Sequence, residues 1–304
     1  MRLMVTGCRG QVGWELTRSL AVLGEVIACD RNEADLTHPA SLKAVVDRIR
    51  PDVIVNAAAY TMVDKAEDEE ALAVTINAEA VRALAQASRD VGALFVHYST
   101  EYVFDGMKSG AYVETDAPNP INAYGRSKLT GEQAVADAAG DWLVFRTSWV
   151  YAARGKNFLR TMLRLASERE TLRVVADQVG APTSARMIAE LTAHAIRQAM
   201  GERASGRFES GLFHLTASGS TTWRGFASRI VDAARALLPP DAVATRAIEA
   251  IATSEYPTPA RRQANSVLDN GKFERRFGLR RAPWDESMQR VLEEIVEQGG
   301  TRTF

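Results

Sequence analysis

The chain has 304 residues, 25% of them charged, and a formal net charge of −1. A balance this close to neutral excludes the basic surface that attracts nucleic acid or an anionic membrane, so we expect neither partner. No apolar run approaches the roughly 20 residues that span a bilayer, and the chain enters a strand-like segment at once, so we expect no signal peptide. This length predicts one large domain or two smaller ones around substantial cores.

In the first half of the chain, short apolar segments alternate with helical patterns. We predict strands at residues 2–6, 25–29, 52–56, 94–99 and 142–146. Helices are predicted at residues 11–22, 39–49, 67–90 and 122–139. Repeated strand–helix–strand units with continuously apolar strands are typical of a parallel sheet covered on both faces, so we predict an α/β fold with a Rossmann-type, doubly wound sheet.

After Trp149 the alternation becomes less regular and prolines interrupt it. A helix at 186–200 and a strand at 212–216 are expected to complete the sheet. We therefore predict a cofactor-binding Rossmann domain formed by residues 1–150 plus about 177–216. A smaller, discontinuous C-terminal substrate lobe is expected at about 151–176 and 217–304.

A glycine-rich loop, Gly7-x-x-Gly10-Gln11-Val12-Gly13, follows the first predicted strand and precedes a helix. This context is typical of dinucleotide binding, in which the pyrophosphate rests on a helix N-terminus. Asp30 ends the next predicted strand, close to where an acidic residue meets the adenine-side ribose. Asp30 suits a 2′-hydroxyl and Arg31 suits a 2′-phosphate, so we expect both NADH and NADPH to serve.

A second motif, Tyr124-Gly125-Arg126-Ser127-Lys128, lies downstream of Ser99-Thr100. A tyrosine and a lysine four apart on a helix share one face, so we expect the Lys128 ammonium to lower the pKa of the Tyr124 phenol. Such a phenol is a suitable general acid for a carbonyl that becomes an alkoxide. A hydroxyl of Ser99 or Thr100 is expected to bind the same oxygen. Together with a nicotinamide dinucleotide, these groups predict a reductase.

The two cysteines, Cys8 and Cys29, are too few for a disulfide framework. Their scarcity fits the reducing cytoplasm, where we expect the protein to work. We interpret Cys8 as a small residue that fills the glycine turn.

Taken together, these residues resemble the extended short-chain dehydrogenase/reductases and, among them, the dTDP-4-dehydrorhamnose reductase family. The resemblance runs from residue 2 to about 270 and rests on the motifs above and on six further blocks. These blocks are Asp35-Leu36, Asn56-Ala57-Ala58-Ala59-Tyr60-Thr61-Met62-Val63-Asp64-Lys65-Ala66-Glu67, Ser99-Thr100-Glu101-Tyr102-Val103-Phe104-Asp105-Gly106, Arg146-Thr147-Ser148-Trp149-Val150-Tyr151, Asp177-Gln178-Val179-Gly180-Ala181-Pro182-Thr183 and Asn265-Ser266-Val267-Leu268-Asp269. One departure is Gln263, where the family usually has proline, and it affects the rigidity of that segment.

The resemblance implies a reaction and the residues that perform it. Hydride passes from NADPH or NADH to C4 of dTDP-4-dehydro-β-L-rhamnose, which gives dTDP-L-rhamnose in the last step of its synthesis. By matched position, Tyr124 donates the proton, Lys128 lowers its pKa and holds the nicotinamide ribose, and Thr100 binds the C4 oxygen. The residues implied to line the cofactor are Gly7, Gly10, Gln11, Val12, Asp30, Arg31, Asp35, Leu36, Ala57, Ala58, Ala59, Tyr60, Tyr124 and Lys128. Those implied to face the dTDP-sugar are Thr61, Val63, Thr100, Glu101, Tyr102 and Trp149.

A metal and a homodimer are the two least specific implications of the resemblance. Some relatives place Mg²⁺ at a dimer contact near the position of Glu15. Read from the residues alone, Glu15 is a partner of the helix dipole, and no cluster has metal-ligand spacing. We therefore expect no metal, with Glu15 as the only candidate ligand.

Proteins with two other functions have similar sequences. A nucleotide-sugar dehydratase or epimerase shares the fold, but a dehydratase usually has an Asp-Glu pair after the threonine, where this chain has Glu101-Tyr102. An epimerase would keep its NAD bound through turnover. The other alternative is a non-catalytic NADP-binding regulatory subunit, and the intact Thr100, Tyr124 and Lys128 argue against it.

Overall fold

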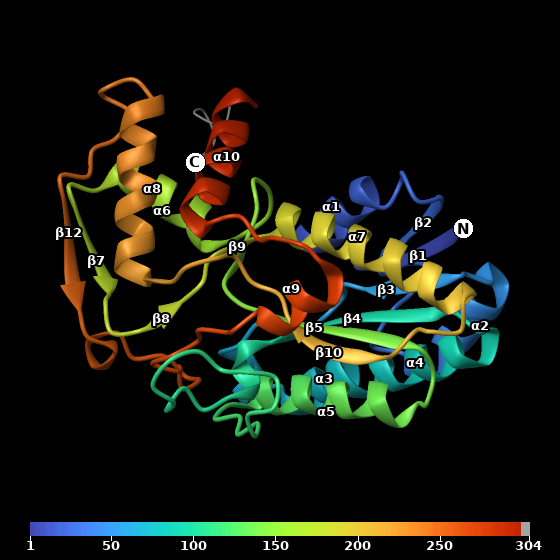
Figure 1. Ribbon diagram of the computed structural model, residues 1–304. Helices are drawn as coiled ribbons and strands as arrows, with labels where there is room; N and C mark the ends of the chain where they lie inside the picture. Colours follow the sequence, from blue (N-terminus) through green and yellow to red (C-terminus); the bar gives the residue numbers. More distant parts are fainter. Residues whose placement is uncertain (299–304) are drawn as a thin grey trace.

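A computed structural model describes residues 1–298, and its centre is a six-stranded parallel sheet (Figure 1). The order is β10-β5-β4-β3-β1-β2, and every neighbouring pair is parallel. The strands are β1 (Arg2–Thr6), β2 (Glu25–Cys29), β3 (Val53–Asn56), β4 (Leu94–Thr100), β5 (Trp142–Thr147) and β10 (Gly211–His214). The predicted Rossmann-type α/β fold is confirmed.

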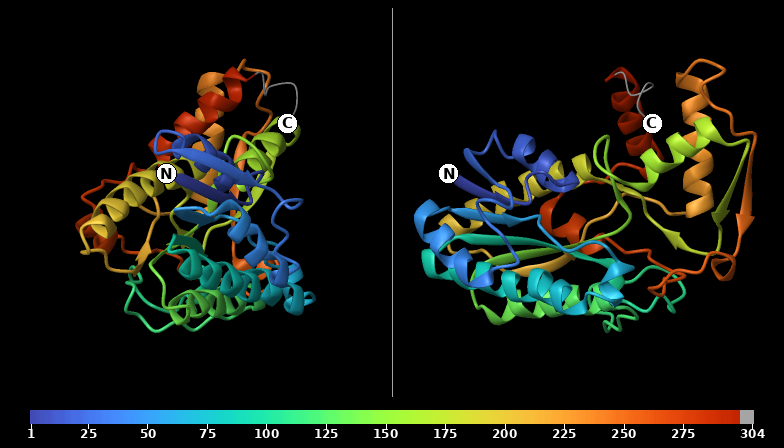
Figure 2. Two further views of the ribbon diagram at one scale, coloured as in Figure 1. Left: turned by 90° about the vertical axis from the view of Figure 1, so that its right-hand side faces the viewer. Right: turned by 180° about the vertical axis from the view of Figure 1, so that it is seen from behind.

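Helices cover both faces of this sheet (Figure 2). On one face lie α1 (Gln11–Ser19), α7 (Ala185–Ala204) and α9 (Gly271–Phe277), and on the other lie α2 (Pro39–Ile49), α4 (Ala80–Val91) and α5 (Ala123–Asp137). Alternate strand residues enter the two cores: Leu3 and Val5 pack with α1 and α7, whereas Met4 packs with α2 and α4. This alternation is the pleat of a strand buried on both sides.

The region predicted as one helix over 67–90 is divided in the structure. It contains the 3₁₀ turn η1 (Lys65–Glu67), α3 (Glu70–Val74), the π-helical segment η2 (Thr75–Glu79) and then α4. The buried Asn77 lies in the π segment and bonds both backbone groups of Tyr60, with its Oδ1 2.9 Å from Tyr60 N and its Nδ2 3.0 Å from Tyr60 O. A π segment often marks a functional region, and here it anchors the chain that leaves β3.

A second lobe, at the left of Figure 1, has its own hydrophobic core. It contains α6 (Phe158–Glu168), α8 (Trp223–Leu237) and α10 (Trp284–Glu297) around the parallel pair β7 (Thr171–Val175) and β12 (Ala247–Ile251).

The remaining short elements of the chain are η3 (Glu101–Val103), β6 (Val150–Tyr151), β8 (Val179–Gly180), β9 (Thr183–Ser184), β11 (Thr221–Thr222) and η4 (Thr253–Glu255). The exact domain boundaries stay a prediction.

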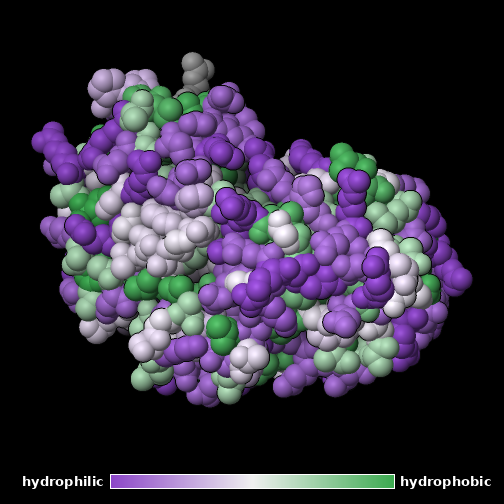
Figure 3. All heavy atoms as spheres, viewed as in Figure 1, coloured by the Kyte–Doolittle hydropathy of each residue, from purple (hydrophilic) through white to green (hydrophobic). Residues whose placement is uncertain are grey.

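The face in Figure 3 is mostly hydrophilic, with hydrophobic residues scattered over it. Scattered apolar residues of this kind are normal on protein surfaces. Among the described helices, none has both the length and the apolar character needed to cross a membrane.

A buried ion pair joins β5 to α5. Arg146 donates from Nε and Nη2 to the two carboxylate oxygens of Glu132, at 2.8 and 2.6 Å. The side chains are only 3% and 6% exposed. A two-pronged pair of this kind has the geometry in which arginine binds carboxylate best. It holds the sheet against the helix that carries Tyr124 and Lys128.

Removing one partner should therefore destabilise the fold. We expect Glu132→Leu to lower the free energy of unfolding by about 3–5 kcal/mol, because the buried Arg146 charge loses its partner. Urea titration measures this change. The control is Glu168→Leu, which breaks the exposed Arg164–Glu168 pair and should change stability by less than about 1 kcal/mol. Similar small losses in both variants would contradict the role given to the buried pair.

Candidate active site

A cavity of about 700 Å³ lies at the carboxyl ends of the central strands. Loops after β1, β3, β4 and β5 and the start of α5 form its walls. The carboxyl edge of a parallel sheet is where such folds bind ligands. Its lining includes Gly7, Gly10, Gln11, Val12, Ala57, Ala58, Ala59, Thr61, Val63, Ser99, Thr100, Glu101, Tyr102, Tyr124, Lys128 and Trp149.

The glycine loop leaves its backbone accessible at one end of this cavity. Gly7 has φ +69°, and a Cβ there would lie 2.8 Å from the backbone of Ala58. A Cβ on Gly13 would lie 2.1 Å from the Gly7 carbonyl oxygen. Helix α1 begins at Gln11, and its N-cap residue, Gly10, supplies no side-chain hydrogen bond. The first N–H groups of α1 are thus available for an anion, and this arrangement fits a dinucleotide pyrophosphate.

Several residues implied to bind the cofactor lie outside the lining of this cavity. Asp30 forms an ion pair with Arg9, and Arg31 Nε lies 3.5 Å from Asp35 Oδ1. Leu36 is buried in the core beside α2, and the Tyr60 hydroxyl donates to Glu69 at 2.5 Å. Arg9 does line the cavity and is 81% exposed, so it connects Asp30 to the glycine loop. Its position next to Gly10 was a signal that the sequence interpretation did not use.

Tyr124 and Lys128 both lie in the first part of α5, where Asn122 caps the helix by accepting from Gly125 N at 2.8 Å. Lys128 Nζ donates to the Tyr98 carbonyl oxygen at 2.7 Å and lies 3.3 Å from His97 Nε2. Burial lowers the pKa of Lys128 to about 8. Burial also raises the pKa of the Tyr124 phenol above its ordinary value, and the nearby Glu101 raises it further.

The expected lowering of the Tyr124 pKa by Lys128 is therefore wrong for this structure. The two residues do share a helix face, but the ammonium bonds to the end of β4 and the half-buried phenol lies at the cavity wall. Burial disfavours the charged form of both groups. In this arrangement the phenol keeps its proton and the ammonium is close to losing one.

Lys128 also ends a buried polar row that crosses the sheet. The Thr6 hydroxyl donates to Asn56 Oδ1 at 2.6 Å, and Asn56 Nδ2 lies 3.1 Å from His97 Nδ1. Burial lowers the pKa of His97 well below its ordinary value, so the ring is neutral. His97 thus lies as a neutral histidine inside β4 between Asn56 Nδ2 and Lys128 Nζ, and its one unprotonated nitrogen can accept a hydrogen bond from only one of these two donors.

The end of β4 places Thr100 and Glu101 at the cavity. The Thr100 hydroxyl bonds to Glu101 Oε2 at 2.7 Å, and Tyr102 N donates to Thr100 Oγ1 at 3.2 Å. Glu101 is 3% exposed, and burial raises its pKa to about 7 although the bond with Thr100 opposes that rise. The neighbouring Ser99 hydroxyl is buried and finds no partner in the described part of the chain.

A second cavity, of about 430 Å³, shares Tyr102 and Trp149 with the first. The Trp149 ring stacks on Trp223 with centroids 3.5 Å apart and an interplanar angle of 8°. Trp149 has φ +47°, an unusual value for a large side chain, which indicates that its surroundings hold it in place. Trp149 was predicted from the sequence, whereas Trp223 was missed because no sequence signal pairs the two.

Cationic groups also line this second cavity. Arg173 and Arg262 belong to its walls, and Arg262 Nη2 pairs with Asp64 at 2.8 Å. Gln263 lines the same cavity and donates from Nε2 to the carbonyl oxygens of Glu101 and Phe104, at 3.1 and 2.7 Å. The Gln263 side chain thus anchors residues 101–104 through hydrogen bonds.

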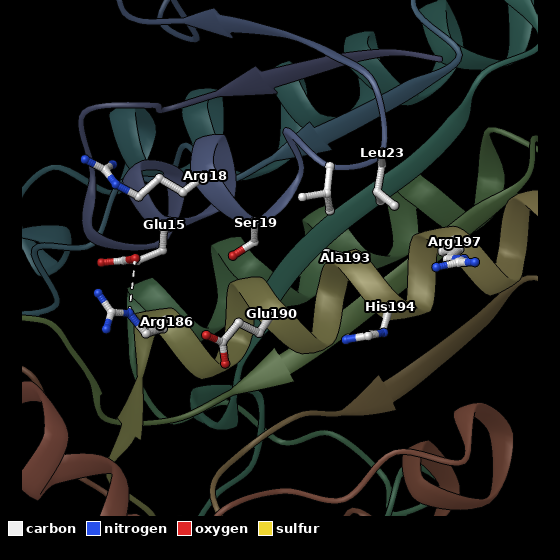
Figure 4. Close-up of a pocket in the computed structure, with 10 residues that line it drawn as sticks. Glu15, Arg18, Ser19, Leu23, Arg186, Glu190, Ala193, His194 and Arg197 are labelled. Atoms are coloured by element: carbon white, nitrogen blue, oxygen red, sulfur yellow. Dashed lines mark ion pairs between the residues drawn. The ribbon is translucent and has the colours of Figure 1, made fainter.

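Glu15 lies elsewhere, in a cavity of about 390 Å³ between α1 and α7 (Figure 4). Its carboxylate is 3.7 Å from Arg186 Nε, and Glu190 and His194 line the same cavity. Within residues 1–298, no group of three or more histidine, cysteine, aspartate or glutamate side chains could hold a metal ion. The Mg²⁺ considered for Glu15 therefore has no support in this structure.

Comparison with known proteins assigns the chain to a family. Residues 1–297 match the model described as the RmlD substrate binding domain. A dTDP-4-dehydrorhamnose reductase of Burkholderia thailandensis is 57% identical over 98% of this chain and 100% of its own length. One of Salmonella typhimurium is 48% identical over 97% of this chain and 98% of its own.

A solved structure extends the likeness to three dimensions. The crystal structure of dTDP-4-dehydrorhamnose reductase from Bacillus anthracis in complex with NADP has a TM-score of 0.85 and 35% identity to this chain, covering 96% of it and 99% of the other chain. Sequence and fold agree over nearly the whole length, so this chain belongs to the dTDP-4-dehydrorhamnose reductase family.

Proposed function

We propose that this chain reduces the C4 carbonyl of dTDP-4-dehydro-β-L-rhamnose to the alcohol of dTDP-L-rhamnose, with NADPH or NADH as the reductant. The observation that carries the proposal is one cavity lined by the glycine loop, Thr100, Tyr124 and Lys128. Relatives named for this reaction, and one solved with NADP, support it. A homodimer and a cytoplasmic location stay predictions.

The residues divide into two subsites. The glycine loop and Ala57–Ala59 are suited to the dinucleotide, which when bound supplies the hydride. Asp30, Arg31, Asp35, Leu36 and Tyr60 are proposed to bind its outer part. The second cavity is suited to the dTDP-sugar, because it combines the Trp149 and Trp223 rings with the cationic Arg173 and Arg262. Thr61, Val63 and Tyr102 lie on the first cavity's wall and are proposed to face the sugar ring.

The chemistry follows from the protonation of the catalytic groups. A hydride that arrives at C4 leaves negative charge on the sugar oxygen, and the protonated Tyr124 phenol can neutralise it. Thr100 hydrogen-bonds the same oxygen. The Lys128 ammonium is held at the end of β4 by Tyr98 O, where it is suited to bind the nicotinamide ribose.

The direct test is a turnover assay. The purified protein should oxidise NADPH and NADH in the presence of dTDP-4-dehydrorhamnose, followed by the loss of nicotinamide absorbance. Product analysis should identify dTDP-rhamnose. Cofactor binding without turnover of any dTDP-sugar would instead support the regulatory alternative.

The first prediction of this mechanism concerns the proton donor. Tyr124→Phe should lower kcat by about 10²–10⁴ with little change in cofactor affinity, because only the acid is removed. Lys128→Met should lower both kcat and cofactor affinity. Steady-state kinetics and a cofactor titration separate the two effects. A Tyr124→Phe enzyme with near wild-type kcat would show that the proton comes from another group.

The second prediction concerns the cofactor's phosphate. Arg31→Ala should weaken binding of NADPH but not of NADH, by about 1–3 kcal/mol if a charge-assisted bond is lost. Arg164→Ala, an exposed arginine on α6, is the control and should affect neither cofactor. Equal losses for NADPH and NADH would remove Arg31 from the phosphate site.

The third prediction concerns the stacked tryptophans. Trp149→Ala should raise KM for the dTDP-sugar and leave cofactor affinity nearly unchanged, because its ring borders the sugar cavity. Thermal unfolding provides the control measurement. A large drop in Tm with a normal KM would show that Trp149 serves the core instead.

A further inference from the structure

The Thr100 hydroxyl already has two hydrogen-bond partners in the structure, and a substrate oxygen would be a further one. A hydroxyl offers one proton and two acceptor lone pairs. Tyr102 N occupies one lone pair, at 3.2 Å, and Glu101 Oε2 lies 2.7 Å away. Whether a substrate oxygen meets the Thr100 proton or a Thr100 lone pair depends on which of the two residues, Thr100 or Glu101, donates the hydrogen bond between them.

That direction follows from the charge of Glu101. An ionised carboxylate only accepts, so it takes the single Thr100 proton and leaves a lone pair toward the cavity. A lone pair repels the carbonyl oxygen that Thr100 is meant to bind. A neutral Glu101 instead donates its own proton into the second Thr100 lone pair, and the Thr100 proton becomes free for the substrate.

We propose that Glu101 is a positioning residue that acts through Thr100, and that only its neutral form lets Thr100 donate a hydrogen bond to the reacting carbonyl. The inference rests on the proposed function, which it deepens. Tyr124 remains the proton donor, and Glu101 transfers no proton in the reaction. It sets the direction of one hydrogen bond.

The surroundings of Glu101 support a neutral form near physiological pH. The side chain is buried, and no ion pair reaches it within residues 1–298. The ionisable groups around it are the phenols of Tyr102 on η3 and Tyr124 on α5, with Lys128 one turn further along α5 and bonded to Tyr98 O. The charges of Arg262 and Asp64 lie beyond Tyr102 and pair with each other. Burial raises the pKa of Glu101 to about 7.

The test compares wild type with Glu101→Gln by single-turnover hydride transfer across pH. The glutamine amide donates at every pH, as neutral Glu101 does. From the pKa values of about 7 for Glu101 and about 8 for Lys128, the wild-type rate should fall about twentyfold between pH 6 and pH 8, because both groups titrate, and the variant's only about twofold, because Lys128 alone titrates. Glu168→Gln, on the exposed face of α6, should keep the wild-type ratio.

Two outcomes would overturn the proposal. One is a Glu101→Gln enzyme with the wild-type pH ratio. The other is an infrared pH titration of the intact protein that assigns no titrating carboxyl to Glu101. That result would be a wild-type spectrum in which no protonated carboxyl signal disappears between pH 6 and pH 8, or a Glu101→Gln spectrum with the same signal loss as wild type. The infrared measurement needs no turnover. A wild-type enzyme that titrates as described but reduces no dTDP-sugar would overturn the proposed function rather than the hydrogen-bond switch.

Discussion

The site depends on the parallel register of β4 between β3 and β5. Thr100 pairs with Thr147 and His97 with Asn56, so residues far apart in the chain end at one edge of the sheet. Parallel strands bring all their carboxyl ends to the same side. Because β4 is buried along its whole length, a shift of one residue would exchange its two faces and carry Thr100 away from the cavity.

The same register explains why a lysine can be held in so buried a place. The polar row Thr6–Asn56–His97 crosses three neighbouring strands inside an otherwise apolar core. Buried polar groups of this kind are tolerated when each has a partner. The row ends at Lys128, which explains how a helix residue is fixed relative to the sheet.

Local patterns predicted much of this arrangement. The helix at 39–49 agrees with α2 at both ends, because Pro39 opens it and Arg50 closes it in a left-handed conformation. The helix expected over 67–90 is interrupted at residues 68–69 and contains a π segment, in which Asn77 bonds to Tyr60, a tertiary contact that helix periodicity cannot register. Motif spacing singled out Thr100, Tyr124 and Lys128, and the structure brings all three to the lining of one cavity. The bond from Lys128 to Tyr98, like the stack of Trp149 on Trp223, depends on packing between segments distant in sequence.

Gln263 has a consequence for how the active-site segment responds to heat. A proline stiffens a loop mainly by restricting the unfolded chain, an entropic contribution. The Gln263 amide holds the segment instead through two hydrogen bonds in the folded state, to the carbonyl oxygens of Glu101 and Phe104. A restraint of this kind is lost when the side chain leaves its rotamer, whereas a ring constraint is covalent. The order of residues 101–104 therefore depends on the Gln263 side chain keeping the one rotamer that makes both hydrogen bonds.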